Sequence, residues 1–216
     1  MQNRVANDKK GVLVVVSGFA GSGKGTVVKE IISKYDNYAL SISATTRAPR
    51  PGEVDGREYF FKTKEEFEEM IEKGMLIEYA QYVGNYYGTP REYVEKQLEE
   101  GKDVILEIEI QGAMKIKERF KDAILVFMTP PSATELYNRL KGRNTESQDV
   151  IMARMARAIE ESKGMGDYDY LLINDTVDAC VCDLQDIVLG RAKQLKDKDT
   201  IIKNIQAGLA EIVEGE

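Results

Sequence analysis

Histidine is missing from this chain of 216 residues, and so is tryptophan. Without an imidazole, the protein has neither a histidine acid or base nor a histidine metal ligand. Only two cysteines are present, Cys180 and Cys182. In the helix that we expect there, side chains two positions apart point about 200° away from each other, so they suit neither a disulfide nor a shared metal ion. We expect both to be packing or surface residues, which leaves phosphate, magnesium, arginine and carboxylate chemistry.

Long hydrophobic runs and an excess of positive charge are also missing. No apolar stretch approaches the ~20 residues of a membrane span, and the amino terminus has no hydrophobic region typical of a signal peptide. We therefore expect a cytoplasmic protein without a membrane partner. The formal net charge of −7 disfavours a general nucleic-acid surface, although local basic clusters can still bind phosphates. Hydrophobic residues at 43% and charged residues at 31% are typical of a globular chain, expected here as one folding unit with insertions.

Residues 12–35 contain the most informative pattern, in which an apolar run, a glycine-rich turn ending in Lys24 and an amphipathic helix follow one another. The apolar run is typical of a strand buried on both faces. Gly18, Gly21 and Gly23 permit a tight loop whose N–H groups surround a phosphate at the positive end of the helix dipole. Lys24 can reach the β- and γ-phosphates. The alternative is an ordinary glycine turn, and the order of strand, loop, lysine and helix argues against it.

The loop departs from the commonest form at Gly25, because many such loops carry there the Ser or Thr that binds Mg²⁺. Thr26 stands one place late. We therefore expect no direct protein ligand for the metal, with Mg²⁺ held by phosphate oxygens and water. The G-K-G-T form resembles nucleoside monophosphate kinases more than GTPases.

Five apolar segments that alternate with helices predict an α/β fold, a three-layer sandwich around a five-stranded parallel sheet. The expected strands are residues 12–17, 38–43, 104–110, 124–128 and 168–173. The piece from about residue 43 to 102 interrupts the alternation with short strands and helices, and we interpret it as an inserted subdomain. Two capping boxes, Thr63–Glu66 and Ser132–Glu135, predict the starts of helices.

A basic loop and a pair of carboxylates are the other candidate functional features. Two prolines stiffen residues 43–53, so this segment presents Arg47 and Arg50 from a fixed loop; a solvated basic loop is the alternative. Along the strand expected at residues 104–110, Glu107 and Glu109 share one face near the carboxyl end, where parallel sheets bind ligands. A half-exposed edge strand would give the same pattern.

With these motifs in place, the sequence closely resembles the guanylate kinase family over nearly its whole length. The motifs that carry the resemblance are S-G-F-A-G-S-G-K-G-T (Ser17–Thr26), S-A-T-T-R-A-P-R-P-G-E (Ser43–Glu53), G-N-Y-Y-G-T (Gly84–Thr89), L-E-I-E-I-Q-G (Leu106–Gly112), R-L-K-G-R (Arg139–Arg143) and I-N-D (Ile173–Asp175). The resemblance implies the reaction ATP + GMP ⇌ ADP + GDP with Mg²⁺. It also implies a division into a core with the phosphate loop (1–42), a GMP-binding insertion (43–102), core (103–133), a mobile lid (134–157), and core with C-terminal helices (158–216).

The resemblance further implies the residues that bind GMP. Its phosphate would be held by Arg47, Arg50, Tyr59 and Tyr87, since guanidinium and phenol groups are strong donors for a dianion. Its guanine would be read by Ser43, Glu78 and Thr89. Glu107 and Glu109 complete the set of GMP-binding residues. The sequence leaves open whether these glutamates contact magnesium-bound water or GMP itself.

For ATP, the resemblance implies binding by the loop and by one residue after the last strand. The ATP set is Gly18, Phe19, Ala20, Gly21, Ser22, Gly23, Lys24, Gly25, Thr26 and Asn174. The catalytic set is Lys24, Arg139, Arg143 and Arg154, whose arginines belong to the lid. Arg157 matches no family position, and we interpret it as a solvated helix residue.

Two other interpretations remain at this stage. An adenylate-type kinase is suggested by G-K-G-T, but Glu78 and the segment Tyr86–Thr89 argue against it. An inactive guanylate-kinase-like interaction module would usually lack a complete phosphate loop and lid, whereas Lys24, Arg143 and Arg154 are present here. The expected partners are ATP and GMP, with no nucleic acid or membrane. A monomer and a homodimer are equally compatible with the sequence.

Overall fold

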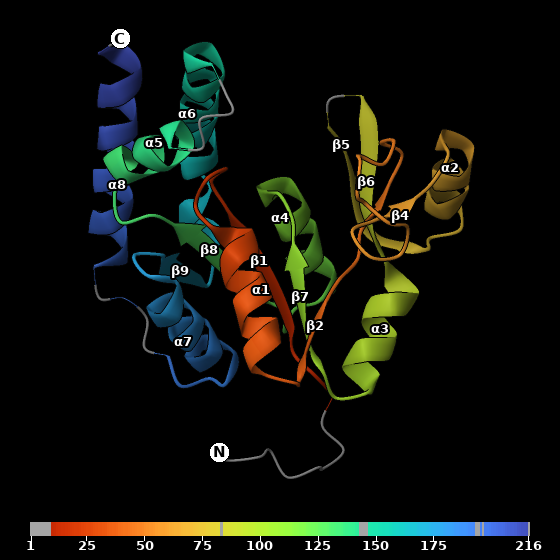
Figure 1. Cartoon of the computed structure of the whole chain (residues 1–216). Helices are drawn as coiled ribbons and strands as arrows, with labels where there is room; N and C mark the ends of the chain where they lie inside the picture. The colour runs from red at the N-terminus through yellow and green to blue at the C-terminus, as the bar shows by residue number, and fades with distance from the viewer. Residues whose placement is uncertain (1–9, 83, 143–146, 193–194, 196, 216) are drawn as a thin grey trace.

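Two β-sheets form the frame of the chain in the computed structural model, which describes residues 10–82, 84–142, 147–192, 195 and 197–215. The larger sheet has five parallel strands in the order β2-β7-β1-β8-β9. These strands are β2 Tyr38–Leu40, β7 Asp103–Glu107, β1 Leu13–Gly18, β8 Ile124–Thr129 and β9 Tyr170–Ile173. The predicted α/β architecture with one five-stranded parallel sheet is confirmed (Figure 1).

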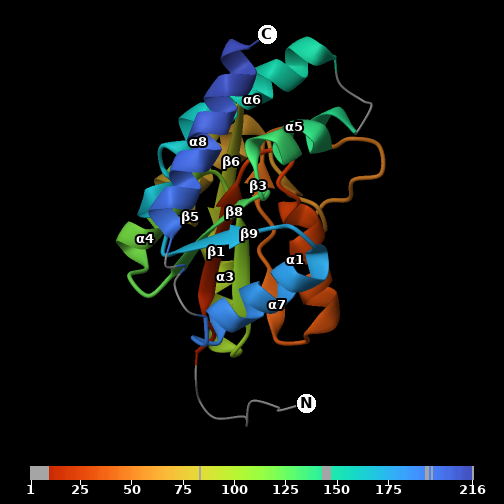
Figure 2. The same ribbon diagram turned by 90° about the vertical axis from the view of Figure 1, so that its left-hand side faces the viewer.

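Helices cover both faces of this sheet, which explains why its strands read as continuous apolar runs. On one face, α1 Lys24–Lys34 and α7 Val177–Val188 pack against Val14, Val16 and Val126. The opposite face is covered by α4 Ile110–Arg119, α5 Ala133–Lys141, α6 Gln148–Ser162 and α8 Lys198–Glu214. Figure 2 shows α8 lying along α6 and α5, away from α1 and α7. The result is the three-layer arrangement expected from the sequence.

The smaller sheet has four strands in the order β4-β3-β6-β5 and lies to one side of the core (Figure 1). Its strands are β4 Phe60–Phe61, β3 Ala44–Thr45, β6 Asn85–Pro90 and β5 Leu76–Tyr82. Helix α2 Lys64–Glu72 packs on it through buried Phe67, and α3 Arg91–Glu99 leads back to the core. All of these elements fall within residues 43–102. The sequence pattern did not predict β6; Gly84, at φ 77°, reverses the chain so that β6 pairs with β5.

Both predicted caps are present at their helices. Thr63 forms the complete capping box with Glu66 at the start of α2. The Ser132 side chain accepts a hydrogen bond from the Glu135 backbone N–H at the start of α5. The short 3₁₀ turn η1, Met165–Asp167, follows α6. Cys180 is buried and Cys182 exposed, and both are free thiols, as predicted.

Three strand boundaries differ from the prediction by two residues or more. The strand expected to reach residue 43 stops at Leu40, because the chain crosses there to the smaller sheet. The strand expected from residue 168 begins at Tyr170; the Asp169 carboxylate accepts the Leu125 N–H and so replaces a ladder bond. The strand expected to reach residue 110 stops at Glu107.

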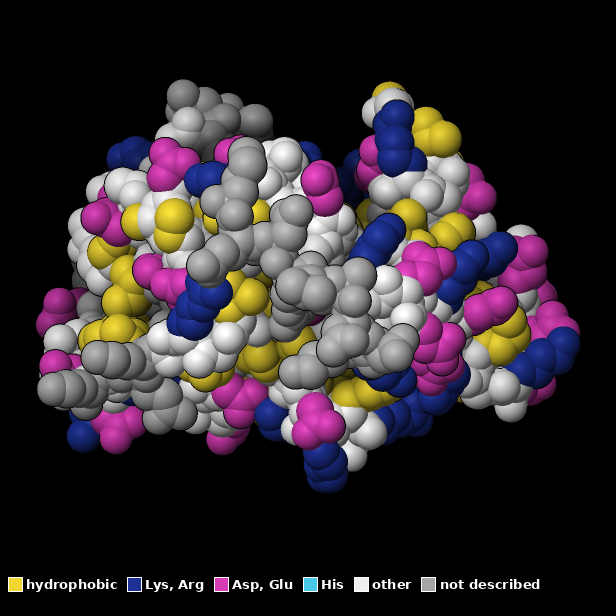
Figure 3. All heavy atoms as spheres, turned by 90° about the horizontal axis from the view of Figure 1, so that it is seen from below, with side chains coloured by type: hydrophobic (Ala, Val, Ile, Leu, Met, Phe, Trp, Pro, Cys, Tyr) yellow, Lys and Arg dark blue, Asp and Glu magenta, His cyan; other side chains and the backbone are white. Residues whose placement is uncertain are grey.

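The surface seen from below mixes charges of both signs. In Figure 3, basic and acidic side chains lie interspersed rather than gathered by sign, in keeping with a small net negative charge. Among the described residues, no helix has the length and apolar character needed to cross a membrane.

Candidate active site

The glycine-rich loop between β1 and α1 folds tightly because two of its glycines leave no room for a side chain. Gly18 has φ 149°, and a Cβ there would lie 2.0 Å from the Met128 carbonyl oxygen. Gly23 has φ 91°, and a Cβ there would lie 2.4 Å from Asn174 Nδ2. Both positive φ angles belong to the region that side chains disfavour. The neighbouring strands β8 and β9 therefore fix the shape of the loop.

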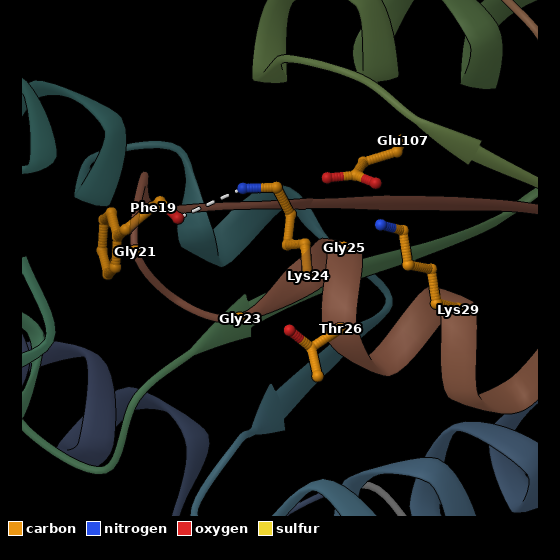
Figure 4. Close-up of a pocket in the computed structure, with 8 residues that line it drawn as sticks. All are labelled: Phe19, Gly21, Gly23, Lys24, Gly25, Thr26, Lys29 and Glu107. Atoms are coloured by element: carbon orange, nitrogen blue, oxygen red, sulfur yellow. Dashed lines mark hydrogen bonds between the residues drawn. The ribbon is translucent and has the colours of Figure 1, made fainter. Parts of the chain in front are cut away.

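A hollow of about 310 Å³ opens above this loop (Figure 4). Its lining residues are Phe19, Gly21, Gly23, Lys24, Gly25, Thr26, Lys29 and Glu107. Lys24 Nζ donates hydrogen bonds to the carbonyl oxygens of Gly18 at 2.6 Å and Phe19 at 3.1 Å. Its ammonium group therefore lies at the mouth of the loop, beside the start of α1. A cation and a helix N-terminus together make a strong site for a polyphosphate.

Glu107, from the carboxyl end of β7, faces this hollow between the ammonium groups of Lys24 and Lys29 (Figure 4). Its side chain borders the open space, yet enough protein surrounds it that burial raises the pKa of its carboxyl; Lys24 and Lys29 oppose that rise. A Cβ on Gly25 would lie 4.0 Å from both Glu107 carboxylate oxygens. The Glu107 carboxylate therefore lies close to position 25, where many such loops carry a Ser or Thr hydroxyl. Its oxygen atoms are of the kind that Mg²⁺ prefers.

The donor set suits a magnesium ion carried by a nucleotide. Mg²⁺ keeps several waters and is bound through phosphates and one or two carboxylates rather than by an all-protein cage. Glu107 supplies such a carboxylate beside the loop. Within the described ranges, no group of three or more Cys, Asp or Glu side chains is arranged to hold a metal ion by itself.

Arg139 and Asn174 close the loop from the side of α5 and β9. Asn174, only 3% exposed, donates from Nδ2 to the Ser22 carbonyl oxygen at 2.8 Å. Arg139 donates to the Asn174 carbonyl oxygen at 2.9 Å and forms an ion pair with Glu135 at 2.7 Å. Both predicted residues therefore lie against the loop, with Arg139 engaged in contacts within the chain.

A second cluster of predicted residues lies on the smaller sheet and in the loops beside it. Arg47 forms a forked pair with both oxygens of Glu53, each at 2.9 Å, and its guanidinium lies 5.3 Å from the centre of the Tyr59 ring. The rings of Tyr59 and Tyr87 are 6.1 Å apart. The Arg47 guanidinium, together with the Arg50 backbone N–H, lowers the pKa of the Glu53 carboxyl. Burial raises the pKa of Tyr59, so its hydroxyl remains a protonated donor.

Glu78 and Thr89 form a buried polar pair on adjacent strands β5 and β6. The Thr89 hydroxyl donates to Glu78 Oε1 at 2.8 Å, and the two residues are 1% and 7% exposed respectively. Burial raises the pKa of the Glu78 carboxyl, while Thr89 and Lys115 oppose the rise. Ser43 is half-buried and its carbonyl oxygen accepts the Phe60 N–H. A buried carboxylate of this kind is a strong acceptor for a ligand that brings its own N–H groups.

A sequence model of the family described as guanylate kinase matches residues 10–190 of the chain. The chain belongs to the guanylate kinase family. It is 54% identical over 170 residues to a guanylate kinase of Lactococcus lactis, covering 79% of this chain and 83% of that protein. It is 49% identical over 196 residues to one of Caldanaerobacter subterraneus, covering 90% and 95%. The crystal structure of guanylate kinase from Anaplasma phagocytophilum superimposes with a TM-score of 0.68 at 31% identity, covering 96% of each chain.

Not all the residues predicted from the guanylate kinase motifs lie together. The Glu107 and Glu109 side chains do not share a strand face, because the strand ends at Glu107 and Glu109 is the N-cap of α4. Glu109 instead pairs with Arg157 at 2.9 Å, so Arg157 is not simply a solvated residue. Arg154 is half-buried on α6. Arg143 lies outside the described residues.

The structure places two further residues beside the candidate residues, and sequence reasoning missed both. Lys29 stands one helical turn after Gly25, and this spacing could have placed it beside the loop. Glu53 ends the proline-stiffened basic loop, where its charge opposite to Arg47 and Arg50 was the available signal.

Proposed function

We propose that this chain catalyses the reversible, magnesium-dependent transfer of a phosphoryl group from ATP to GMP, giving ADP and GDP. The observation that carries the proposal is the pairing of two unlike sites in one guanylate kinase family member. One is a phosphate loop with Lys24 at its mouth. The other is a buried carboxylate, Glu78, beside a cluster of arginine and tyrosine.

Glu78 supports guanine as the base of the acceptor. Its carboxylate can accept hydrogen bonds from both guanine N1–H and the 2-amino group, with Ser43 and Thr89 beside it. Adenine has neither donor and presents a lone pair at N1, which would face the charge. Losing a charge-assisted hydrogen bond in a buried site costs roughly 1.5–3 kcal/mol, or about one to two orders of magnitude in selectivity.

In the proposed mechanism, the acceptor phosphate is held by Arg47, Arg50, Tyr59 and Tyr87. Its oxygen is already an anionic nucleophile, so no general base is required, and alignment and charge neutralisation carry the catalysis. Lys24 would neutralise charge on the phosphoryl group during its transfer. The lid arginines Arg139, Arg143 and Arg154 would do the same from the other side.

Magnesium, when bound with ATP, would supply positive charge to the β- and γ-phosphates. Glu107 stands where it can orient the water around that ion, and Glu109 is assigned to the acceptor side. Gly18–Thr26 and Asn174 would bind ATP.

We also propose the division of labour among the segments. Residues 43–102 act as the GMP-binding insertion and residues 134–157 as a lid, between core segments 1–42, 103–133 and 158–216. Closure of both would exclude water, which otherwise competes for the phosphoryl group. We expect a cytoplasmic enzyme, monomeric or homodimeric, whose partners are ATP and GMP.

The test is a substrate panel of GMP, dGMP, AMP, UMP and CMP, each with ATP and Mg²⁺, with ADP formation measured. GMP should be preferred over AMP by about one to two orders of magnitude, and EDTA should abolish turnover. A preference for AMP would overturn the assignment in favour of an adenylate-type kinase. No turnover with any acceptor would favour an interaction module.

A further inference from the structure

Arg157 forms an ionic bridge between two helices that border the proposed active site. Its guanidinium donates from Nη2 to Glu109 Oε2 at 2.9 Å, and from Nε to Glu161 Oε1 at 2.8 Å. Glu109 lies at the head of α4, whereas Arg157 and Glu161 lie on the carboxyl-terminal half of α6. The bridge therefore links Arg157, the last residue of the proposed lid, to the turn between β7 and α4.

Glu109 occupies the cap position of α4 but does not use its side chain there. Short polar side chains such as Asp or Ser at this position accept a hydrogen bond from the first turn of the helix, and the longer Glu is not one of the preferred caps. In the part of the chain that the structure describes, the Glu109 side chain makes no such cap bond. It extends instead to Arg157. The direction of this carboxylate is thus set by a residue 48 positions later in the chain.

The head of α4 is where the carboxylates of the proposed site converge. Glu107 lies two residues before Glu109 and borders the ATP hollow. Ser17, at the end of β1, donates from its hydroxyl to the Ile108 carbonyl oxygen at 2.7 Å. This bond fixes the position of Ile108, which lies between the two glutamates. On the other side, a Cβ on Gly112 would lie 2.9 Å from Glu78 Oε2. Glu109 lies in the segment between Glu107 and Gly112, and its side chain lines a separate hollow together with Arg157 and Gln81 of the smaller sheet.

We propose that Arg157 is a positioning residue for GMP binding, because it holds the Glu109 carboxylate in the direction that the acceptor nucleotide meets. The inference rests on the proposed function and assigns a role to a residue that no family motif covers. The Glu109 side chain is 61% exposed, so without a partner it would sample several rotamers and lose that freedom on binding GMP.

The second contact explains why an arginine suits this position. The Glu161 side chain is only 15% exposed, and its pairing with Arg157 fixes one edge of the guanidinium. The other edge is then directed at Glu109. A lysine ammonium is a point charge on a flexible stem and lacks this planar fork. Arg157→Lys should therefore restore only part of the function that Arg157→Gln removes.

Steady-state kinetics of Arg157→Gln test the proposal. We expect KM for GMP to rise about two- to fivefold, the scale of an exposed ion pair. KM for ATP should stay unchanged and kcat within about twofold of wild type. Arg91→Gln is the matched control, since Arg91 forms an ion pair with Glu95 on α3 at 3.5 Å and is 38% exposed, close to the 41% of Arg157.

A double-mutant cycle with Glu109→Gln separates positioning from a merely structural role. If Arg157 acts through Glu109, the double variant should bind GMP no worse than Glu109→Gln alone. Additive losses, an equal rise in KM for ATP, or an effect no larger than that of Arg91→Gln would each overturn the proposal. Wild-type enzyme in the substrate panel is measured first, so a failure of the proposed function shows there and not in the variants.

Discussion

Single residues in this protein combine functional and stability roles that pull in opposite directions, and Glu78 is the clearest case. Its carboxylate is 7% exposed and its pKa is raised by burial, so folding disfavours the charged form. The proposed recognition of guanine needs that charged form. A polar group whose burial opposes folding, yet which faces a ligand site, is typical of a functional residue.

Replacing Glu78 with glutamine should therefore weaken function without weakening the fold. We expect KM for GMP to rise by about 10- to 100-fold, through loss of a charge-assisted acceptor, while KM for ATP is retained. The free energy of unfolding at pH 8 should equal or exceed that of wild type. Urea titrations check the prediction on stability, and steady-state kinetics check the prediction on KM. An equal rise in KM for GMP and for ATP would indicate a folding defect instead.

The pH dependence of this effect has a definite sign. Because the folded pKa of Glu78 is raised, the folded state binds the proton more tightly than the unfolded chain. The stability of wild type relative to Glu78→Gln should therefore decline as pH rises from the ordinary carboxyl range through the folded pKa. GMP binding should decline in the opposite direction, as acid neutralises the carboxylate.

In the proposed mechanism, Lys24 is the residue on which the phosphoryl transfer most depends. Its ammonium already lies against the Gly18 and Phe19 carbonyl oxygens at the mouth of the loop. Lys24→Met should lower kcat by at least ~10² through lost electrostatic stabilisation, with the circular dichroism spectrum unchanged. Lys34→Met, at the exposed end of the same helix, is the control and should retain wild-type turnover. Normal turnover in Lys24→Met would contradict the assigned role.

At the scale of elements, periodicity predicted the five core strands because their apolar runs are buried on both sides. It failed at the β7–α4 boundary. The alternation of apolar residues and glutamate continues to Ile110, so the sequence favours a longer strand. The structure ends it at Glu107, and the Ile108 carbonyl oxygen accepts the Ser17 hydroxyl instead of a ladder N–H. A contact between residues 91 apart decides the boundary, and no local pattern reports it.

The residues of the candidate site also fall into two groups: those that local sequence patterns can predict and those that depend on contacts between distant segments. Loop residues such as Lys24 were identifiable because their function depends on local spacing. The contacts of Glu109 were not, since its partner Arg157 comes from a distant helix. Lys29 shares a helix face with Gly25 and could have been inferred, but its approach to Glu107 depends on the pairing of β1 with β7.

The packing of α4 against β5 makes Gly112 a sensitive position. A Cβ there would lie 2.9 Å from Glu78 Oε2 and 3.2 Å from Ile108 Cδ1. Gly112→Ala should cost about 1–3 kcal/mol through overpacking and raise KM for GMP by displacing the Glu78 carboxylate. Gly166→Ala is the matched control, because no atom lies within 4 Å of its added Cβ. Chemical denaturation of both variants measures the difference in their free energies of unfolding. Equal values would show that α4 shifts to accept the added methyl group without loss of stability.

At the scale of the whole molecule, the proposed function divides one site between the two sheets. The five-stranded sheet, at one side of Figure 1, carries the phosphate loop. Glu107 ends its strand β7, whereas Glu78 lies on β5 of the four-stranded sheet, with Arg47 and Tyr59 in the loops beside β3 and β4. Several cations already have partners within the chain: Arg47 is paired with Glu53, and Arg139 with Glu135. If these arginines bind nucleotide phosphates as proposed, the phosphates compete with these contacts, which favours a rearrangement when both ligands are present.

We expect ADP and GMP together to draw the smaller sheet and the lid segment toward the phosphate loop. Each nucleotide alone neutralises the cations of only one half of the proposed site. The electrostatic stabilisation of the closed arrangement is therefore complete only when both nucleotides are bound. Small-angle scattering should show a smaller radius of gyration with both nucleotides than with either alone. Arg47→Gln, which removes a cation from the smaller sheet, should reduce the contraction. If the radius stayed constant through saturation with both ligands, catalysis would have to proceed in the open arrangement, and the role of closure in excluding water would be wrong.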